Sequence, residues 1–84
     1  MLRTKRRGYL RNVAIALGNA KDPTSLPELT NVLLSEAEPS VRAHTAWALG
    51  QIGTQEARLS LESALKIEAD PAVLLEIDTA RSVI

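Results

Sequence analysis

Cysteine and phenylalanine are both absent from this chain of 84 residues. Without cysteine the chain has no disulfide, no thiolate metal site, no ligand for an iron–sulfur cluster and no catalytic thiol. Tyr9 and Trp47 are its only aromatic residues. Its apolar share of 45% is ordinary for one small globular domain and argues against disorder. Because these residues are mostly Ala, Leu, Val and Ile, we expect a core of modest volume.

Long apolar runs are also missing. No run approaches the roughly 20 residues that a membrane-spanning helix needs. The N-terminus is basic, but no apolar segment follows it, which is not the pattern of a signal peptide. We therefore expect a cytoplasmic protein.

Acidic residues are absent from the first quarter of the chain. Residues 1–21 carry six basic residues and no acid, whereas residues 22–84 carry four basic and ten acidic residues, so that the net charge is zero. Such an asymmetry suggests that the N-terminal end faces a polyanion.

The apolar pattern predicts five helices. Residues 1–8 are too charged to be buried, and we expect them to form an extended or fraying basic arm that leads to Gly8. Asp22, Thr54 and Asp70 are expected N-caps, since their side chains accept hydrogen bonds from free backbone N–H groups. The expected helices cover residues 9–20, 23–35, 41–53 (with Pro39 just inside the start), 54–67 and 71–84. Links of two to four residues imply antiparallel neighbours.

An internal repeat appears at an offset of 32 residues. Leu17, Gly18 and Asn19 align with Leu49, Gly50 and Gln51. The second and fourth predicted helices follow at the same offset, with Leu29, Leu33 and Glu36 against Leu61, Leu65 and Glu68. A period of this length made of two helices predicts an all-α solenoid, with repeats over residues 9–38 and 39–69 and a half repeat over 70–84. The Val-Arg and Ala-Leu-Gly pattern resembles the HEAT-like repeats of bacterial proteins.

Two segments carry a more specific resemblance. Residues 4–19 (TKRRGYLRNVAIALGN) and residues 41–50 (VRAHTAWALG) resemble the C-terminal region of tRNA epoxyqueuosine reductases. That family uses cobalamin and two [4Fe–4S] clusters to reduce epoxyqueuosine at the tRNA wobble position. The resemblance implies that this chain is a non-catalytic C-terminal domain without a cofactor of its own, and that its partners are the tRNA anticodon stem-loop and the catalytic domain of the same parent chain.

The basic run is the strongest candidate site. Cations placed along phosphates release counterions on binding, and aromatic side chains stack on unpaired bases. The expected RNA-binding residues are Arg3, Lys5, Arg6, Arg7, Tyr9, Arg11 and Asn12. A solubilising tail at a domain junction is the alternative for the basic run, and a structural role is the alternative for Asn12. A generic HEAT-like module for protein–protein interaction is the alternative for the whole chain.

Three residues of the third predicted helix are interface candidates. Arg42 is expected to pair with an acid such as Glu38 or with carbonyls of a neighbouring turn. His44 and Trp47 are three residues apart and lie off the main apolar stripe. We expect a packed, hydrogen-bonded pair at a seam, or a contact with RNA or the parent domain. A lone histidine indicates neither a metal site nor acid–base catalysis.

The acids Glu56, Glu62, Glu68, Asp70, Glu76 and Asp78 are expected on solvent faces and at helix starts.

Overall fold

The computed structural model describes residues 2–84, and for residues 2–4 it describes the backbone alone. These residues form five α-helices and no strand. The helices are α1 (Leu2–Ala20), α2 (Leu26–Ser35), α3 (Pro39–Ile52), α4 (Gln55–Leu65) and α5 (Pro71–Ser82), and the 3₁₀ turn η1 (Pro23–Ser25) precedes α2. The all-α prediction is confirmed.

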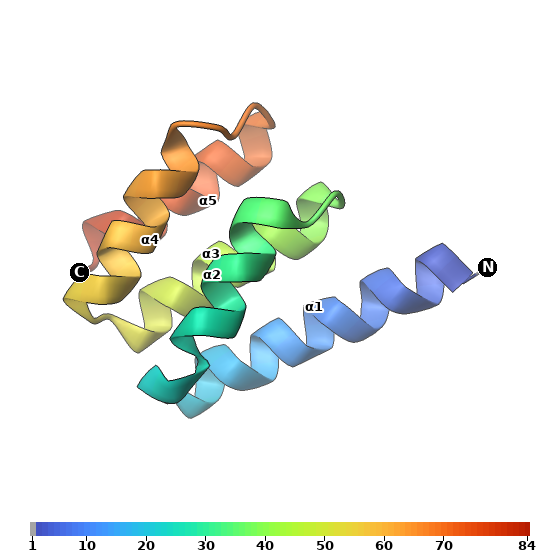
Figure 1. The fold of residues 1–84 in the computed structure, drawn as a ribbon, viewed down its shortest axis with the longest axis horizontal. Helices are drawn as coiled ribbons and strands as arrows, with labels where there is room; N and C mark the ends of the chain where they lie inside the picture. Colours follow the sequence, from blue (N-terminus) through green and yellow to red (C-terminus); the bar gives the residue numbers. More distant parts are fainter. Residues whose placement is uncertain (1) are drawn as a thin grey trace.

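Helix α3 lies at the centre of a two-layer stack (Figure 1). Helices α1 and α5 flank it in one layer, and α2 and α4 cover it in the other. Because α3 has neighbours on several sides, its burial extends beyond the predicted stripe of Val41, Thr45 and Leu49 and includes Ala46 and Gly50. Each pair of helices thus buries its apolar face against the next pair, which is the packing of a helical solenoid.

The N-terminal end differs from the prediction. Helix α1 begins at Leu2, so the expected extended arm is wrong for residues 2–8, and Gly8 continues the helix. Ion pairs from Arg6 to Glu36 and from Arg7 to Glu38 hold this end against the loop between α2 and α3. Their acidic partners come from a distant part of the sequence, so the local pattern of the basic run did not reveal them.

Proline placement explains a second difference. Residues 23–35 form a 3₁₀ turn followed by α2, and not one continuous helix. Pro27 is in the first turn of α2, where a missing N–H is tolerated, and the short 3₁₀ turn leads into it. The fourth helix also ends at Leu65, two residues earlier than expected, because residues 66 and 67 close it with i to i−3 bonds.

The predicted caps are confirmed. The Asp22 carboxylate accepts from the Thr24 N–H at 3.0 Å, and the Thr54 hydroxyl accepts from the Ala57 N–H at 3.1 Å. The Asp70 carboxylate accepts from the N–H groups of Ala72 and Val73 at 2.9 and 3.2 Å. Each side chain satisfies backbone donors that the helix leaves unpaired.

Two residues adopt the left-handed conformation after a helix. Gly53 closes α3 with a φ of 71°, as its position predicts. Lys21, with a φ of 53°, follows α1 in the same conformation, which costs energy for a residue with a side chain. Both turns reverse the chain sharply, which is what places successive helices antiparallel.

Glycines allow the layer that contains α1, α3 and α5 to pack closely. A Cβ added to Gly18 would lie 3.0 Å from the Ala48 Cα, and one added to Gly50 would lie 3.0 Å from the Ala80 Cα. The two contacts therefore repeat between successive pairs of helices. Only glycine leaves room for backbones at this separation.

Candidate RNA-contacting surface and helix seams

The first feature of the candidate site is a two-pronged ion pair. Arg6 Nη1 and Nη2 donate to Glu36 Oε2 and Oε1 at 3.0 and 2.7 Å. The Glu36 side chain is only 4% exposed, and its Oε2 also accepts from the Glu38 N–H at 3.1 Å. The hydrogen bonds from Arg6 lower the pKa of Glu36, and the pKa of Arg6 is raised in turn. Arg6 therefore anchors α1 to the start of the α2–α3 loop.

Arg7 belongs to the same anchor. Its Nη1 lies 3.6 Å from Oε2 of Glu38, the residue that directly precedes α3. Two of the predicted phosphate-binding cations thus face carboxylates of the protein. Their positive charge is partly compensated, so the basic run is less positive than the sequence suggests.

The second feature is an open face of α1. Lys5, Tyr9 and Asn12 are spaced at i, i+4 and i+7, and therefore lie on one side of the helix. All three are exposed, and Tyr9 is 68% exposed. No ion pair involves Lys5 among the residues with described side chains. This face combines a cation, an aromatic ring and an amide.

Arg11 lies on a different side of α1, the side on which Gly18, seven residues later, approaches Trp47 and Ala48 of α3. It is half-buried, and its Nε is buried without a hydrogen-bond partner in the part of the protein that the structure describes. The structure therefore divides the predicted site among three sides of one helix. Arg3 is also in α1, but its side chain lies outside the described residues.

Arg42 makes the second two-pronged pair of the molecule. Its Nε and Nη2 donate to Glu68 Oε1 and Oε2 at 2.8 and 2.9 Å, and its Nη1 donates to the carbonyls of Glu36 and Ala37 at 2.8 and 2.9 Å. The predicted bond to carbonyls is confirmed. The predicted pairing with an acid is made by Glu68, since Arg42 reaches across the seam to the loop between α4 and α5.

Glu68 is one of the acids that we expect on solvent faces or at helix starts, and it lies just before α5 and not on a solvent face. Its side chain is 4% exposed, and its Oε2 accepts from the N–H groups of Ala69 and Asp70 at 3.2 and 3.1 Å. The hydrogen bonds from Arg42 lower the pKa of Glu68. Glu68 thus repeats the role of Glu36, 32 residues earlier, of holding a loop before a helix. A signal was present, since both glutamates precede a proline by three residues.

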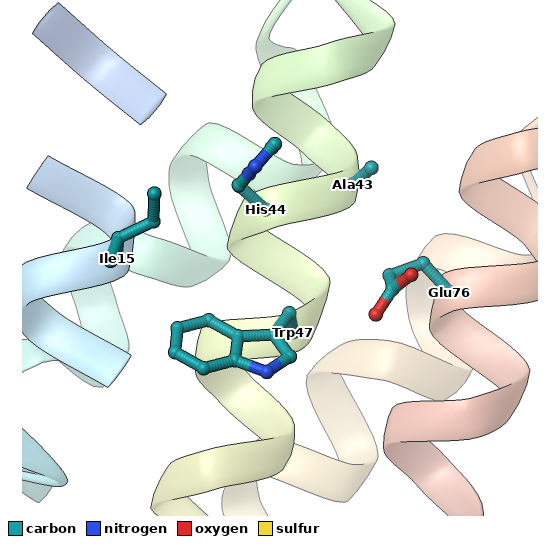
Figure 2. A pocket seen from close by; sticks show the side chains of 5 residues that line it. All are labelled: Ile15, Ala43, His44, Trp47 and Glu76. Atoms are coloured by element: carbon teal, nitrogen blue, oxygen red, sulfur yellow. The ribbon is translucent and has the colours of Figure 1, made fainter. Parts of the chain in front are cut away.

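His44 and Trp47 line a hollow of about 330 Å³ together with Ile15, Ala43 and Glu76. Figure 2 shows the indole ring projecting from α3 toward α1, with His44 one turn away on α3 and Glu76 of α5 on the opposite side. His44 Nδ1 lies 2.7 Å from the Ser40 carbonyl, which makes Nδ1 the protonated nitrogen that donates this bond. The Trp47 ring fills the space beside Gly18. The two side chains are thus packed at a helix seam, where His44 is hydrogen-bonded, and their contact with another domain stays a prediction.

The residues that could bind a metal ion are dispersed over the described part of the chain. Nowhere in the described part do three or more histidine, cysteine or acidic side chains meet in a metal-binding group. The chain has no cysteine, so its residues do not fit the iron–sulfur clusters that the resemblance implies for a parent protein. Among the helices of residues 2–84, none combines the length and the apolar character that crossing a bilayer requires.

Comparison with known proteins agrees with this architecture. A family model described as HEAT repeats matches residues 2–79. The chain belongs to the HEAT-repeat family. An α-solenoid fragment of about two and a half HEAT repeats is therefore its fold, as the internal offset and the helix pairing predict.

Curated relatives of this HEAT-repeat chain are longer proteins. A protein described as uncharacterized, in the gldA 3′ region of Geobacillus stearothermophilus, is 43% identical over 67 residues, which are 80% of this chain and 31% of that protein. The epoxyqueuosine reductase of Bacillus subtilis (strain 168) is 41% identical over 68 residues, 81% of this chain and 18% of the enzyme. The epoxyqueuosine reductase of Listeria monocytogenes is 39% identical over a similar range.

Solved structures give the same result. The crystal structure of a selenomethionine-labelled epoxyqueuosine reductase superposes with a TM-score of 0.81 at 38% identity, over 87% of this chain and 20% of that one. A structure of the Bacillus subtilis enzyme superposes with a TM-score of 0.82 at the same identity. The resemblance to epoxyqueuosine reductases is confirmed, and this chain spans about 20% of the length of the reductase structures it matches.

Proposed function

We propose that this chain is the non-catalytic HEAT-repeat domain of an epoxyqueuosine reductase and that it helps to hold the tRNA anticodon arm against the catalytic domain. The similarity to reductases over 81% of the chain supports the assignment to this class of protein. The reduction itself belongs to the rest of such a protein, because the cluster ligands are cysteines and this chain has none.

The open face of α1 is the observation that carries the tRNA contact. Lys5 supplies a positive charge that no acid of the described chain compensates, and the exposed Tyr9 supplies a ring for stacking. Asn12 adds an amide that donates and accepts hydrogen bonds. Arg11 adds a second cation on the neighbouring side of the helix.

The charge distribution favours this end of the stack for an RNA contact. All ten acidic residues lie in residues 22–84, where they would repel a phosphate backbone. Arg6 and Arg7 contribute to the proposal differently, since their pairs with Glu36 and Glu38 hold α1 in place. We therefore assign phosphate contacts to Lys5 and Arg11, and support of the helix to Arg6 and Arg7.

Salt-dependent binding tests this proposal. A labelled tRNA anticodon stem-loop is titrated with the protein, and fluorescence anisotropy gives the affinity at several salt concentrations. The variant Lys5→Ala/Arg11→Met removes two cations and keeps most of the Arg11 stem. Two lost phosphate contacts are expected to reduce the slope of log affinity against log salt by roughly 1.5.

The matched control is Arg58→Met/Lys66→Ala. It also removes two positive charges, but from α4 and the turn after it. This control is expected to leave the slope and the affinity unchanged. Equal slopes for the wild type and the Lys5/Arg11 variant would refute the proposal, and so would an equal loss in the control.

A further inference from the structure

A groove of about 240 Å³ runs between α1 and α2. It exists because α2 packs against α3 and α4 and hardly against α1, so that the two helices spread apart from the turn that joins them (Figure 1). Tyr9 at its rim is 68% exposed, and Leu10, Val13 and Leu17 of α1 are only half-buried inside it. We call it the α1–α2 groove, and its apolar wall consists of Tyr9, Leu10, Val13, Leu17, Leu29 and Val32.

The internal repeat indicates which kind of partner the α1–α2 groove fits. Val13 and Leu17 correspond to Thr45 and Leu49, 32 residues later. Thr45 and Leu49 are both 0% exposed, and the helix that precedes α3, namely α2, packs on α3. The face of α1 that carries Val13 and Leu17 in the groove is therefore equivalent to the face of α3 on which the preceding helix packs.

The same face is more apolar on α1 than on α3. Leu10 stands where α3 has Arg42, whose guanidinium binds Glu68, and Val13 stands where α3 has Thr45. The Thr45 hydroxyl donates to the Val41 carbonyl, so α3 satisfies its polar group internally. On α1 both positions are aliphatic and half-buried. Contiguous apolar surface of this kind marks an interaction site.

The rim of the groove indicates the charge of the occupant. Within the second layer, the Thr30 hydroxyl of α2 lies 2.7 Å from the Ser60 hydroxyl of α4. Glu28 occupies the position equivalent to Ser60 one repeat earlier, and it lines the groove. An added helix could pack beside α2 in the way that α2 packs beside α4. The residue of that helix equivalent to Thr30 would then lie against the Glu28 carboxylate.

We propose that the α1–α2 groove binds an amphipathic α-helix of the α2 type, with leucine-like side chains at i, i+3 and i+7 and a basic residue opposite Glu28. Leu26, Leu29 and Leu33 show this spacing on α2 itself, where all three pack into the core. The occupant is a segment of the polypeptide that flanks the repeats in a larger protein, since the matched segment is 18% of the Bacillus subtilis reductase. The groove thus continues the helix-on-helix interface of the stack by one more helix.

This inference takes from the proposed function only that the repeats are part of a larger protein. It does not depend on a tRNA contact, because the residues that test it are Glu28 and the apolar wall. Tyr9 lies at the boundary of both surfaces, so the RNA experiment above leaves Tyr9 unchanged.

A peptide in trans provides the test. The probe is a synthetic peptide with the sequence of residues 22–36 and the substitution Thr30→Lys, titrated into methyl-labelled protein. We expect the methyl signals of Leu10, Val13 and Leu17 to shift in a saturable manner. Tyr9→Ser, at a largely exposed position, should weaken binding roughly tenfold without unfolding the protein. Leu75→Ser removes an apolar side chain that is 69% exposed on α5, and it should leave binding unchanged.

A charge exchange makes the test specific. In the protein, Glu28→Lys should weaken binding of the Thr30→Lys peptide and strengthen binding of a Thr30→Glu peptide. The absence of methyl shifts at millimolar peptide would overturn the proposal, as would equal binding of a scrambled peptide. Shifts caused by the stem-loop RNA, or by self-association of the protein without peptide, would assign the groove to a different occupant and would also overturn it.

Discussion

Helices α3 and α5 approach so closely at Gly50 that adding one methyl group there should destabilise the protein. In Gly50→Ala the new Cβ would lie 2.8 Å from the Ala80 Cβ and 3.0 Å from its Cα. Because the Ala80 Cα is a backbone atom, the overlap can be relieved only if the two helices move apart. Overpacking of this kind costs about 1–3 kcal/mol, and the overlap with backbone places this case at the upper end.

Helix propensity acts in the opposite direction. Replacing a glycine by alanine inside a helix gains about 1 kcal/mol. Gly8 provides the matched control, because a Cβ added there meets nothing within 4 Å. Gly8→Ala is therefore expected to stabilise the protein by up to about 1 kcal/mol, whereas Gly50→Ala is expected to destabilise it by about 1–2 kcal/mol.

Urea unfolding followed by circular dichroism at the helix band measures both variants against the wild type. A chain of this size has a free energy of unfolding of about 4–12 kcal/mol, so the opposite shifts of the midpoint are resolvable. If Gly50→Ala stabilised the protein as much as Gly8→Ala, the close helix contact would not exist in solution, and the packing of the α1–α3–α5 layer would need revision.

Three further predictions concern the seams and the loops. In a double-mutant cycle, Arg42→Met and Glu68→Gln should show a coupling of about 1–3 kcal/mol in urea unfolding, because the pair is largely buried and two-pronged; additive effects would contradict this. The pKa values of Glu36 and Glu68 are lower in the folded protein than in the unfolded chain. Their contribution to folding stability is therefore fully present above the unfolded pKa and is lost as pH falls through the folded pKa. Thermal melts should therefore show an acid loss of stability that the variants Glu36→Gln and Glu68→Gln reduce. Lys21→Gly should stabilise the protein by about 1 kcal/mol, since glycine adopts the left-handed conformation without strain, and a lower melting temperature would count against the turn.

Much of the fold follows from local rules that the sequence displays. The spacing of Leu29 and Leu33, the caps at Thr54 and Asp70, and the glycine at position 53 each depend on a few neighbouring residues. The 32-residue offset then relates the helices to one another. Such features are predictable because short-range hydrogen bonds and apolar periodicity decide them.

The candidate site was less predictable, and the ion pairs explain why. The sequence groups Arg6, Arg7 and Arg11 in one basic run, but the fold directs two of them to Glu36 and Glu38 and turns the third toward α3. Pairing across 30 residues depends on how the helices stack, which no local pattern encodes. The start of α1 was missed for the same reason, since distant carboxylates hold it.

We propose that the cations of α1 have two roles: Arg6 and Arg7 hold the helix in place, and Lys5 and Arg11 contact RNA. The most direct test compares Arg6→Gln with Lys5→Ala, measuring the melting temperature and the affinity for the anticodon stem-loop in parallel. We expect Lys5→Ala to weaken RNA binding with an unchanged melting temperature. Arg6→Gln should lower the melting temperature, because Glu36 loses its ion-pair partner. A stable Arg6→Gln variant that loses RNA binding as strongly as Lys5→Ala would contradict the proposal.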